Sequence, residues 1–262
     1  MFVLTFMLIA ASLFLGGGTK GGLLSDAILQ LIAIPVLCVA LWGLLDVPLT
    51  GQIKAALFFV AAVVAIPLVQ LIPLPPLLWS ALPGREPLVE TFNLLGQQLP
   101  WMPISVLPNE TWLSLLSLIP PIAIFVATIQ LSYKDRRGLV VVFLVIGILS
   151  VFLGLIQAAQ GLESPWRFFE FTNFEAAVGF FANKNHFAAL LYSLTVFSAA
   201  WLLYTGVRVV QQFEGGEYSA ASVAAMLGAF TLLVAFLAGA AVAQSRMGLL
   251  LTIIALLSAF AL

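Results

Sequence analysis

Two short polar stretches in this chain carry the residue types that can bind a charged group. The first runs from Asn183 to His186 in the order Asn-Lys-Asn-His and leads straight into a long apolar run. The second is Ser245-Arg246, which also stands directly before an apolar run. An arginine can grip a phosphate through two hydrogen bonds at once, and a helix start favours anions. Together the two stretches predict a site for a phosphate or a diphosphate.

The first stretch also has the pattern of a helix cap. Asn183 or Asn185 is expected to cap the following helix, which places His186 in the first turn. There the helix dipole favours a neutral, proton-accepting imidazole, and the backbone amides are expected to be free. The alternative is that these residues only cap the helix. For Arg246 the alternative is a side chain that reaches lipid phosphates, as arginine near the end of a span commonly does.

The elements that position these stretches are expected to be membrane-spanning helices. Hydrophobic residues make up 63% of the 262-residue chain, charged residues make up 8%, and the mean hydropathy is +1.16. A soluble domain carries about a quarter charged residues. We therefore expect an all-α, polytopic transmembrane helical bundle of about seven or eight spans, since about 20 apolar residues cross the hydrocarbon core. The candidate spans are Phe2–Leu15, Ala27–Leu45, Ile53–Leu74, Trp112–Leu131, Leu139–Ala159, Phe187–Val209, Ser222–Ala243 and Met247–Leu262.

The composition also excludes several classes of function. A net charge of −1 gives no electrostatic basis for nucleic-acid binding. Cys38 is the single cysteine and lies in the middle of a span, which excludes a disulfide framework and a thiolate metal site. We expect neither a metal nor a cofactor. The apolar runs are continuous rather than alternating, which excludes a transmembrane barrel.

Basic residues predict the orientation of the spans. The turn Tyr133–Gly138 holds three basic residues, which indicates the cytoplasmic side. Alternation along the chain then places the N-terminus in the cytoplasm and residues 75–109 and 160–185 on the outer face. Five basic residues fall on each side, but the inside loops are much shorter and have the higher density of positive charge.

The outer loop 75–109 has the pattern of a helix in the headgroup layer. Trp79 and Trp101 flank the pattern and suit interface anchors. A surface helix that only closes the bundle is the simpler alternative. The apolar residues of this pattern recur at spacings of four, three and four, at Leu88, Phe92, Leu95 and Leu99.

We expect one transmembrane domain over residues 1–262, in which residues 1–159 form the N-terminal spans and residues 160–262 hold both polar stretches. Residues 160–185 mix aromatic and charged side chains, which suits a surface facing sugars or lipid headgroups and equally suits an aromatic belt. The spans that follow the two polar stretches both start at the outer face. Their ends are expected to converge with Lys184 and Arg246 on a doubly charged phosphate group.

Several stretches resemble one protein family. Residues 179–189, Gly-Phe-Phe-Ala-Asn-Lys-Asn-His-Phe-Ala-Ala, resemble the Gly-x-Phe-x-Asn-x-Asn-His-x-Ala pattern of the O-antigen ligase and polymerase family. The pair Ser245-Arg246 is similar to the Ser-Arg that opens a later span in the same proteins. Pro73–Trp79 and Leu107–Thr111 are similar to features of bacterial members. The resemblance covers most of the chain.

The resemblance implies a multi-pass glycosyltransferase of the bacterial inner membrane, active on the periplasmic face in lipopolysaccharide or other envelope polysaccharide biosynthesis. Such an enzyme takes a glycan from undecaprenyl diphosphate and passes it to lipid A-core, as a ligase, or to a growing chain, as a polymerase. Its partners are therefore a lipid-linked glycan donor, a lipid or glycan acceptor, and membrane lipids. Arg246 matches the family's diphosphate-binding arginine. The other predicted substrate-binding residues are Ser245, Lys184, Asn183, Asn185 and His186.

The chain departs from the family in one respect. The resemblance implies more spans and a catalytic histidine in a late outer loop. The single histidine here is His186, in the early motif, and the sequence stops at Leu262 inside an apolar run. We expect an N-terminal portion of a longer protein, with the catalytic histidine beyond Leu262, so that the portion is inactive alone. No catalytic residue is assigned within the chain.

Two other functions stay open. Transporters place ionisable residues or broken helices near the membrane midplane, whereas here the charges lie at span ends and the pair Pro120-Pro121 is expected to interrupt one span. A flippase for lipid-linked glycans needs no charge at that depth. A non-catalytic membrane scaffold predicts that changing Arg246 has no consequence.

Overall fold

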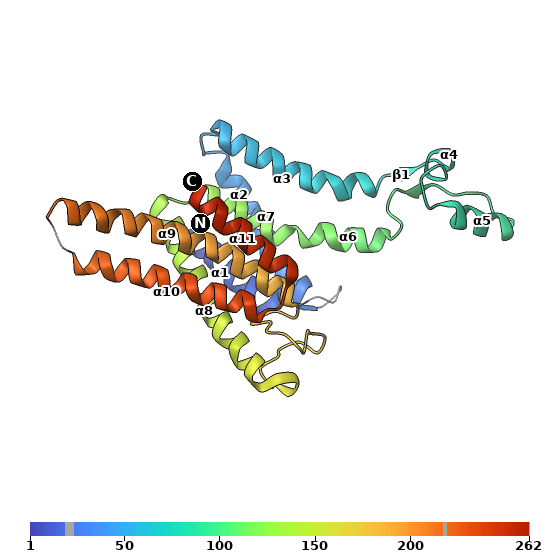
Figure 1. The fold of residues 1–262 in the computed structure, drawn as a ribbon. Coiled ribbons are helices and arrows are strands. Elements are labelled where there is room, and N and C mark those ends of the chain that lie inside the picture. Colours follow the sequence, from blue (N-terminus) through green and yellow to red (C-terminus); the bar gives the residue numbers. More distant parts are fainter. Residues whose placement is uncertain (19–23, 217–218, 262) are drawn as a thin grey trace. The chain divides into compact units, whose positions relative to one another are not determined.

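The structure is a computed structural model that describes residues 1–18, 24–216 and 219–261. Lys20, which the sequence places on the outer face, and Leu262 lie outside the described residues. Helices form almost all of the regular structure (Figure 1). They are α1 (Phe2–Leu15), α2 (Leu24–Leu44), α3 (Gly51–Gln70), α4 (Pro76–Trp79), α5 (Glu86–Leu94), α6 (Pro108–Ser117), α7 (Ile119–Ile129), α8 (Tyr133–Gln160), the 3-10 helix η1 (Gly161–Glu163), α9 (Lys184–Glu214), α10 (Ala220–Val242) and α11 (Arg246–Ala261).

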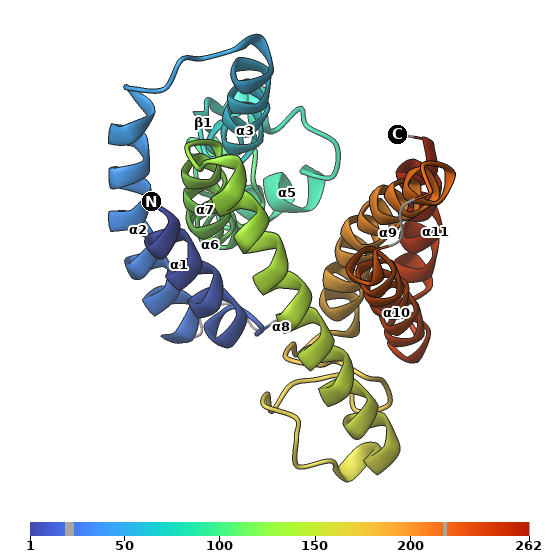
Figure 2. The same ribbon diagram turned by 90° about the vertical axis from the view of Figure 1, so that its left-hand side faces the viewer.

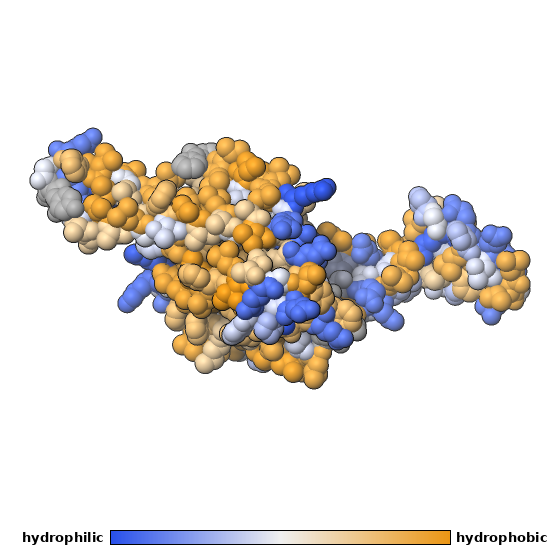
Figure 3. All heavy atoms as spheres, turned by 60° about the horizontal axis from the view of Figure 1, so that its bottom comes forward, coloured by the Kyte–Doolittle hydropathy of each residue, from blue (hydrophilic) through white to orange (hydrophobic). Residues whose placement is uncertain are grey.

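Six segments of the described chain are helices long and apolar enough to cross a membrane, with α6 and α7 counted as one. The helices α1 and α11 are apolar but shorter. Figure 3 shows hydrophobic side chains over most of the visible surface, as expected of helices that face lipid. The prediction of an all-α membrane bundle is confirmed at this level, and the number of spans stays a prediction.

Prolines end or interrupt two of the predicted spans. The helix α3 stops at Gln70, short of its predicted end, and Pro73–Leu74 forms strand β1, paired antiparallel with β2 (Met102–Pro103). The span predicted over Trp112–Leu131 is two helices, α6 and α7, joined at Leu118. Proline has no amide to donate in a helix interior and favours the first turn of a new helix, which explains both differences.

The chain packs as two compact units. Unit 1 consists of Met1–Ile9 and Gly21–Gln130, and unit 2 of Ala10–Lys20 and Leu131–Leu262. The sequence-based division between the N-terminal spans and the motif region is at residue 159. In the structure the two units divide after Gln130, so α8 belongs to unit 2. The prediction of one transmembrane domain stays a prediction.

In unit 1, the segment 71–107 between α3 and α6 folds around Trp79. The indole is fully buried, and its Nε1 donates a hydrogen bond to the carbonyl of Pro100 at 2.8 Å. Trp101 is 66% exposed. Trp79 is therefore a core residue of this segment rather than an interface anchor, whereas Trp101 has the exposure that an anchor needs.

Arg85 supports the same segment from the residue before α5. Its guanidinium donates to the carbonyl of Pro103 at 3.1 Å and to that of Ile104, and it lies 6.0 Å from the centroid of the Trp79 ring. The helix α5 is shorter than its sequence pattern, because it ends at Leu94, before the last two apolar positions. Gly96 follows with a positive φ of 61°.

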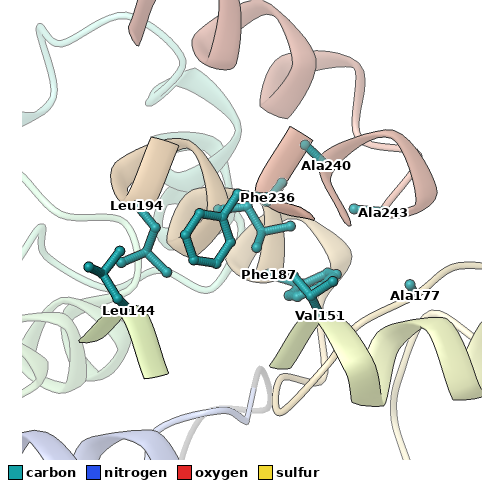
Figure 4. Packing of buried hydrophobic residues seen from close by; sticks show 10 residues of the cluster. Leu144, Val151, Ala177, Phe187, Leu194, Phe236, Ala240 and Ala243 are labelled. Atoms are coloured by element: carbon teal, nitrogen blue, oxygen red, sulfur yellow. The ribbon is translucent and has the colours of Figure 1, made fainter. Parts of the chain in front are cut away.

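In unit 2, α9 packs along α10 and α11, and α8 packs against α9 and α10 (Figures 1 and 2). Figure 4 shows the core of this unit, where aromatic and aliphatic side chains from α8, α9 and α10 meet. Phe187, one residue after His186, is fully buried there. Packing of Phe187 in this core therefore holds the start of α9 in place. The buried members of the cluster are Leu144, Val151, Ala177, Phe187, Ala188, Leu191, Leu194, Phe236, Ala240 and Ala243.

Candidate functional site

The first polar stretch forms the start of α9, and Asn183 caps it. Its Oδ1 accepts a hydrogen bond from the amide of Asn185 at 2.8 Å, and its carbonyl accepts from the amide of His186 at 3.0 Å and from that of the next residue at 3.1 Å. The amide of Lys184 donates to Oδ1 of Asn173 at 2.9 Å. The prediction that an asparagine caps this helix, with His186 in its first turn, is confirmed.

The expectation of free amides at this helix start is wrong. The first four amides of α9 all donate hydrogen bonds within the chain, to oxygens of Asn173 and Asn183. An anion would have to displace one of these oxygens to reach them. What α9 offers to a ligand is therefore its side chains. Asn185 and His186 are exposed, and Lys184 is half-buried.

The second polar stretch forms the start of α11. Ser245 is 2% exposed, and its Oγ accepts a hydrogen bond from the amide of Gly248 at 3.0 Å, as a capping serine does. Gln244 precedes it with a positive φ of 52°, a sparsely populated conformation at the turn from α10 into α11. Arg246 is exposed. Within the described residues, the amides of Arg246 and Met247 donate no hydrogen bond, so the free positive helix end belongs to α11.

The two helix starts meet. The Oγ of Ser245 donates a hydrogen bond to Oδ1 of Asn185 at 2.9 Å, across 60 residues of sequence. A Cβ on Gly248 would lie 2.5 Å from the Cβ of Ala188, so only glycine allows this approach of α11 to α9. The two helix starts therefore lie side by side, and the convergence of Lys184 and Arg246 on a phosphate stays a prediction. Among the described residues, no hydrogen bond or ion pair joins Lys184 to the start of α11.

A side chain of α8 holds the loop that leads into this site. Gln157 is fully buried, and its Nε2 donates to the carbonyls of Trp166 and Gly179, both at 2.9 Å. Its Oε1 accepts from the amides of Val178 at 3.1 Å and Gly179 at 2.9 Å. All four hydrogen-bonding positions of the amide are therefore used. Sequence reasoning missed Gln157, although a polar side chain inside a predicted span was the available signal, because it must find partners there.

The same loop turns back along α8 as far as Ser150. The amide of Phe180 donates to Oγ of the buried Ser150 at 3.4 Å. Ser150 lies ten residues before Gln160, the end of α8, which is about 15 Å of helix. Gly179 has a φ of +56°, and a Cβ there would overlap the Ser150 hydroxyl. Irregular backbone at such depth is tolerated in a membrane where protein covers it.

Arg167 connects two parts of this loop, since it lies near the start of the loop and bonds to residues 173–176. Its Nη1 donates to the carbonyls of Asn173 at 3.1 Å and Ala176 at 2.9 Å, and its Nη2 donates to that of Phe174 at 2.6 Å. Burial lowers the pKa of the Arg167 guanidinium from its ordinary value. Its Nη donors are occupied by carbonyls of the chain itself, whereas its buried Nε has no hydrogen-bond partner among the described residues. These contacts make Arg167 a structural residue. Because Asn173 also caps α9, this network connects the loop to the candidate site.

A hollow of about 320 Å³ lies beside Asn183. Phe171, Thr172 and Phe174 line it together with one carboxylate, that of Glu170. It is the part of the loop in which exposed aromatic rings and polar groups occur together next to the start of α9.

Comparison with protein-family models, with curated proteins and with solved structures gave no match to this chain. Among the described residues, no group of three or more histidine, cysteine, aspartate and glutamate side chains is placed to hold a metal ion. The site itself offers the free amides of α11, the imidazole of His186 and the cations of Lys184 and Arg246, which bind anions and donate hydrogen bonds.

Proposed function

We propose that this protein is a membrane glycosyltransferase of bacterial envelope polysaccharide biosynthesis. It takes a glycan from undecaprenyl diphosphate on the periplasmic side of the inner membrane and passes it to lipid A-core or to a growing chain. This chain contributes the site for the donor diphosphate. The observation that carries the proposal is the hydrogen bond between Ser245 and Asn185, since it joins the two stretches that resemble the O-antigen ligase and polymerase family.

The start of α11 is the part of the site best suited to the diphosphate. It combines the exposed guanidinium of Arg246, the free amides of Arg246 and Met247, and the positive end of the helix dipole. Asn185 and His186 lie on the adjoining helix start and complete the polar surface. This differs from the sequence-based expectation, in which the amides of both helices contribute.

The proposed reaction breaks the bond between the anomeric carbon of the glycan and the diphosphate oxygen, and the acceptor hydroxyl oxygen forms the new bond to that carbon. The leaving diphosphate gains negative charge, which a fixed guanidinium and helix end stabilise. Because the donor is anchored in the bilayer, binding it in place lowers the entropic cost of meeting the acceptor. The acceptor proton passes to a general base, which we do not assign to any residue of this chain.

The membrane arrangement belongs to the same proposal. The eight apolar helical segments serve as spans, with the N-terminus and the turn Tyr133–Gly138 in the cytoplasm. The starts of α9 and α11 and the outer segment 71–107 then face the periplasm. The helix α5 lies in the headgroup layer, where Trp101 supplies an exposed anchor.

Replacement of Arg246 tests the donor site. In Arg246→Ala, binding of undecaprenyl diphosphate is expected to weaken about tenfold to a hundredfold, since hydrogen bonds to charged groups contribute about 1.5–3 kcal/mol. The purified chain in nanodiscs is titrated with undecaprenyl diphosphate and with undecaprenyl monophosphate, and the bound lipid is measured by native mass spectrometry. Lys54→Ala is the matched control, because Lys54 is an exposed cation in the first turn of another apolar helix, α3.

Equal affinity of Arg246→Ala and the unaltered protein would refute the donor site and favour a scaffold. The flippase alternative is separated with a labelled donor in reconstituted vesicles. A flippase carries the label across the bilayer, whereas a protein that only binds and transfers leaves the donor in its own leaflet.

A further inference from the structure

A second cavity of unit 2 combines arginines, aromatic rings and an apolar floor. It has a volume of about 590 Å³ and lies between the first turns of α8 and the second half of α9. Its α8 wall carries Arg136 and Arg137, which are both exposed, and its α9 wall carries Trp201 and Tyr204. It shares no lining residue with the site at the starts of α9 and α11.

The lining changes from charged to apolar along the helices. On α8 the arginines give way to Val141 and then to the buried Leu144, and on α9 Tyr204 gives way to Phe197. From Arg137 to Leu144 the helix rises about 10 Å. A phospholipid has the same order of chemistry, because its phosphate lies at the interface and its acyl chains extend inward.

The charge at this end is positive. No carboxylate lines the cavity. Asp135 lies in the same turn of α8 and bonds to Ser132 rather than lining the cavity. Its negative charge is outnumbered by Lys134, Arg136 and Arg137. Arg208 adds a further cation one turn beyond Tyr204, with its guanidinium 5.8 Å from the centroid of that ring.

We propose that this cavity binds an anionic phospholipid. The phosphate lies on Arg136 and Arg137, and one acyl chain follows the apolar wall past Val141 to Phe197. Charge complementarity carries the choice of an anionic lipid over a zwitterionic one, since basic pockets between transmembrane helices bind anionic headgroups. Trp201 and Tyr204 suit the interface level at which the glycerol backbone lies. The inference does not depend on the proposed glycan transfer.

Fluorescence quenching at Trp201 tests the proposal directly. The full chain is reconstituted in vesicles of phosphatidylcholine and phosphatidylglycerol in which one of the two lipids has brominated acyl chains. The quenching due to Trp201 is the difference between the unaltered protein and Trp201→Phe. We expect an apparent preference for phosphatidylglycerol of about 30-fold, because each arginine near an anionic surface contributes about a fivefold gain.

The double variant Arg136→Gln/Arg137→Gln is expected to bring this preference close to one. Lys134→Gln is the matched control, because it removes a cation from the same turn that does not line the cavity, and it is expected to keep most of the preference. An equal loss in Lys134→Gln would overturn the proposal, since it would show a response to general surface charge.

Two further results overturn the proposal without relying on the double variant. One is equal quenching of Trp201 by both brominated lipids in the unaltered protein. The other is loss of the preference when inorganic phosphate is added at constant ionic strength, which would show that the arginines bind free phosphate. Persistence of the preference under phosphate supports a lipid held by both its headgroup and its chain.

Discussion

The two long connections of this chain are held in place in different ways. The segment 71–107 of unit 1 is organised by its own residues, since Trp79 and Arg85 donate hydrogen bonds to carbonyls within the segment. The loop 161–183 of unit 2 has bonds of its own at Arg167 but is also held by α8, because Gln157 bonds to its backbone from inside the bundle. The first connection is self-contained, whereas the second is part of the packing of its unit.

This difference predicts which part of the protein is destabilised by a substitution in each connection. A defect in segment 71–107 should stay within it. A defect in the loop 161–183 should reach the start of α9, because Asn173 of that loop accepts the hydrogen bond from the amide of Lys184. Only the second connection is therefore expected to influence the candidate site.

The largest effect is expected from Gln157→Leu. The leucine fills similar space but leaves two carbonyls and two amides of the loop without partners, which costs about 4 kcal/mol at about 1 kcal/mol per bond. Amide hydrogen exchange measured by mass spectrometry should show faster exchange over residues 166–180 and in the first turn of α9. Gln160→Leu is the control, because Gln160 is exposed and accepts one hydrogen bond, from Ser164. Unchanged exchange at the α9 start in Gln157→Leu would remove the distinction between the two connections.

A smaller and more local effect is expected from Trp79→Phe. This change removes the hydrogen bond to the carbonyl of Pro100 and shortens a fully buried ring, which together cost about 2 kcal/mol. Exchange should accelerate within segment 71–107 and remain unchanged in unit 2. Trp101→Phe serves as the control at an exposed position and should stay within about 0.5 kcal/mol of the unaltered protein. Acceleration of exchange at the start of α9 would contradict the self-contained character of the segment.

The smallest effect is expected from Ser245→Ala. It removes the cap of α11 and the hydrogen bond to Asn185, at a cost of about 1 kcal/mol. Exchange at the amide of Gly248 should accelerate, with little change elsewhere in unit 2. Ser258→Ala removes a hydroxyl from the same helix at an exposed position and should have no such effect. Equal exchange in the two variants would show that Ser245 does not secure the junction of α9 and α11.

Hydropathy predicted the helices well, because the requirement to satisfy backbone amides in lipid acts on each segment separately. The first helix has the predicted bounds Phe2–Leu15, and most others end within a few residues of the prediction. The pairing of Pro73–Leu74 with Met102–Pro103 and the burial of Trp79 depend on contacts between distant residues. Hydropathy carries no information about such contacts.

In the candidate site, too, local features could be predicted from the sequence and contacts between distant residues could not. The cap at Asn183 follows from local chemistry and was predicted. The order of the spans predicts that the starts of α9 and α11 lie at one face, and the packing of α11 against α9 brings Ser245 to Asn185. The role of Asn173 was not foreseen, because its carboxamide reaches the amide of Lys184 only through the path of the loop. Together with the cap at Asn183, that hydrogen bond leaves no free amide in the first turn of α9.

Backbone contact sets the spacing between the starts of α9 and α11. At Gly248 the main chain of α11 rests against the methyl group of Ala188, and even one added methyl group would push the helices apart. Helices already this close cannot tighten further around a ligand. A donor that binds at this junction would meet a preorganised surface, so little of its binding free energy would be spent on rearranging the protein.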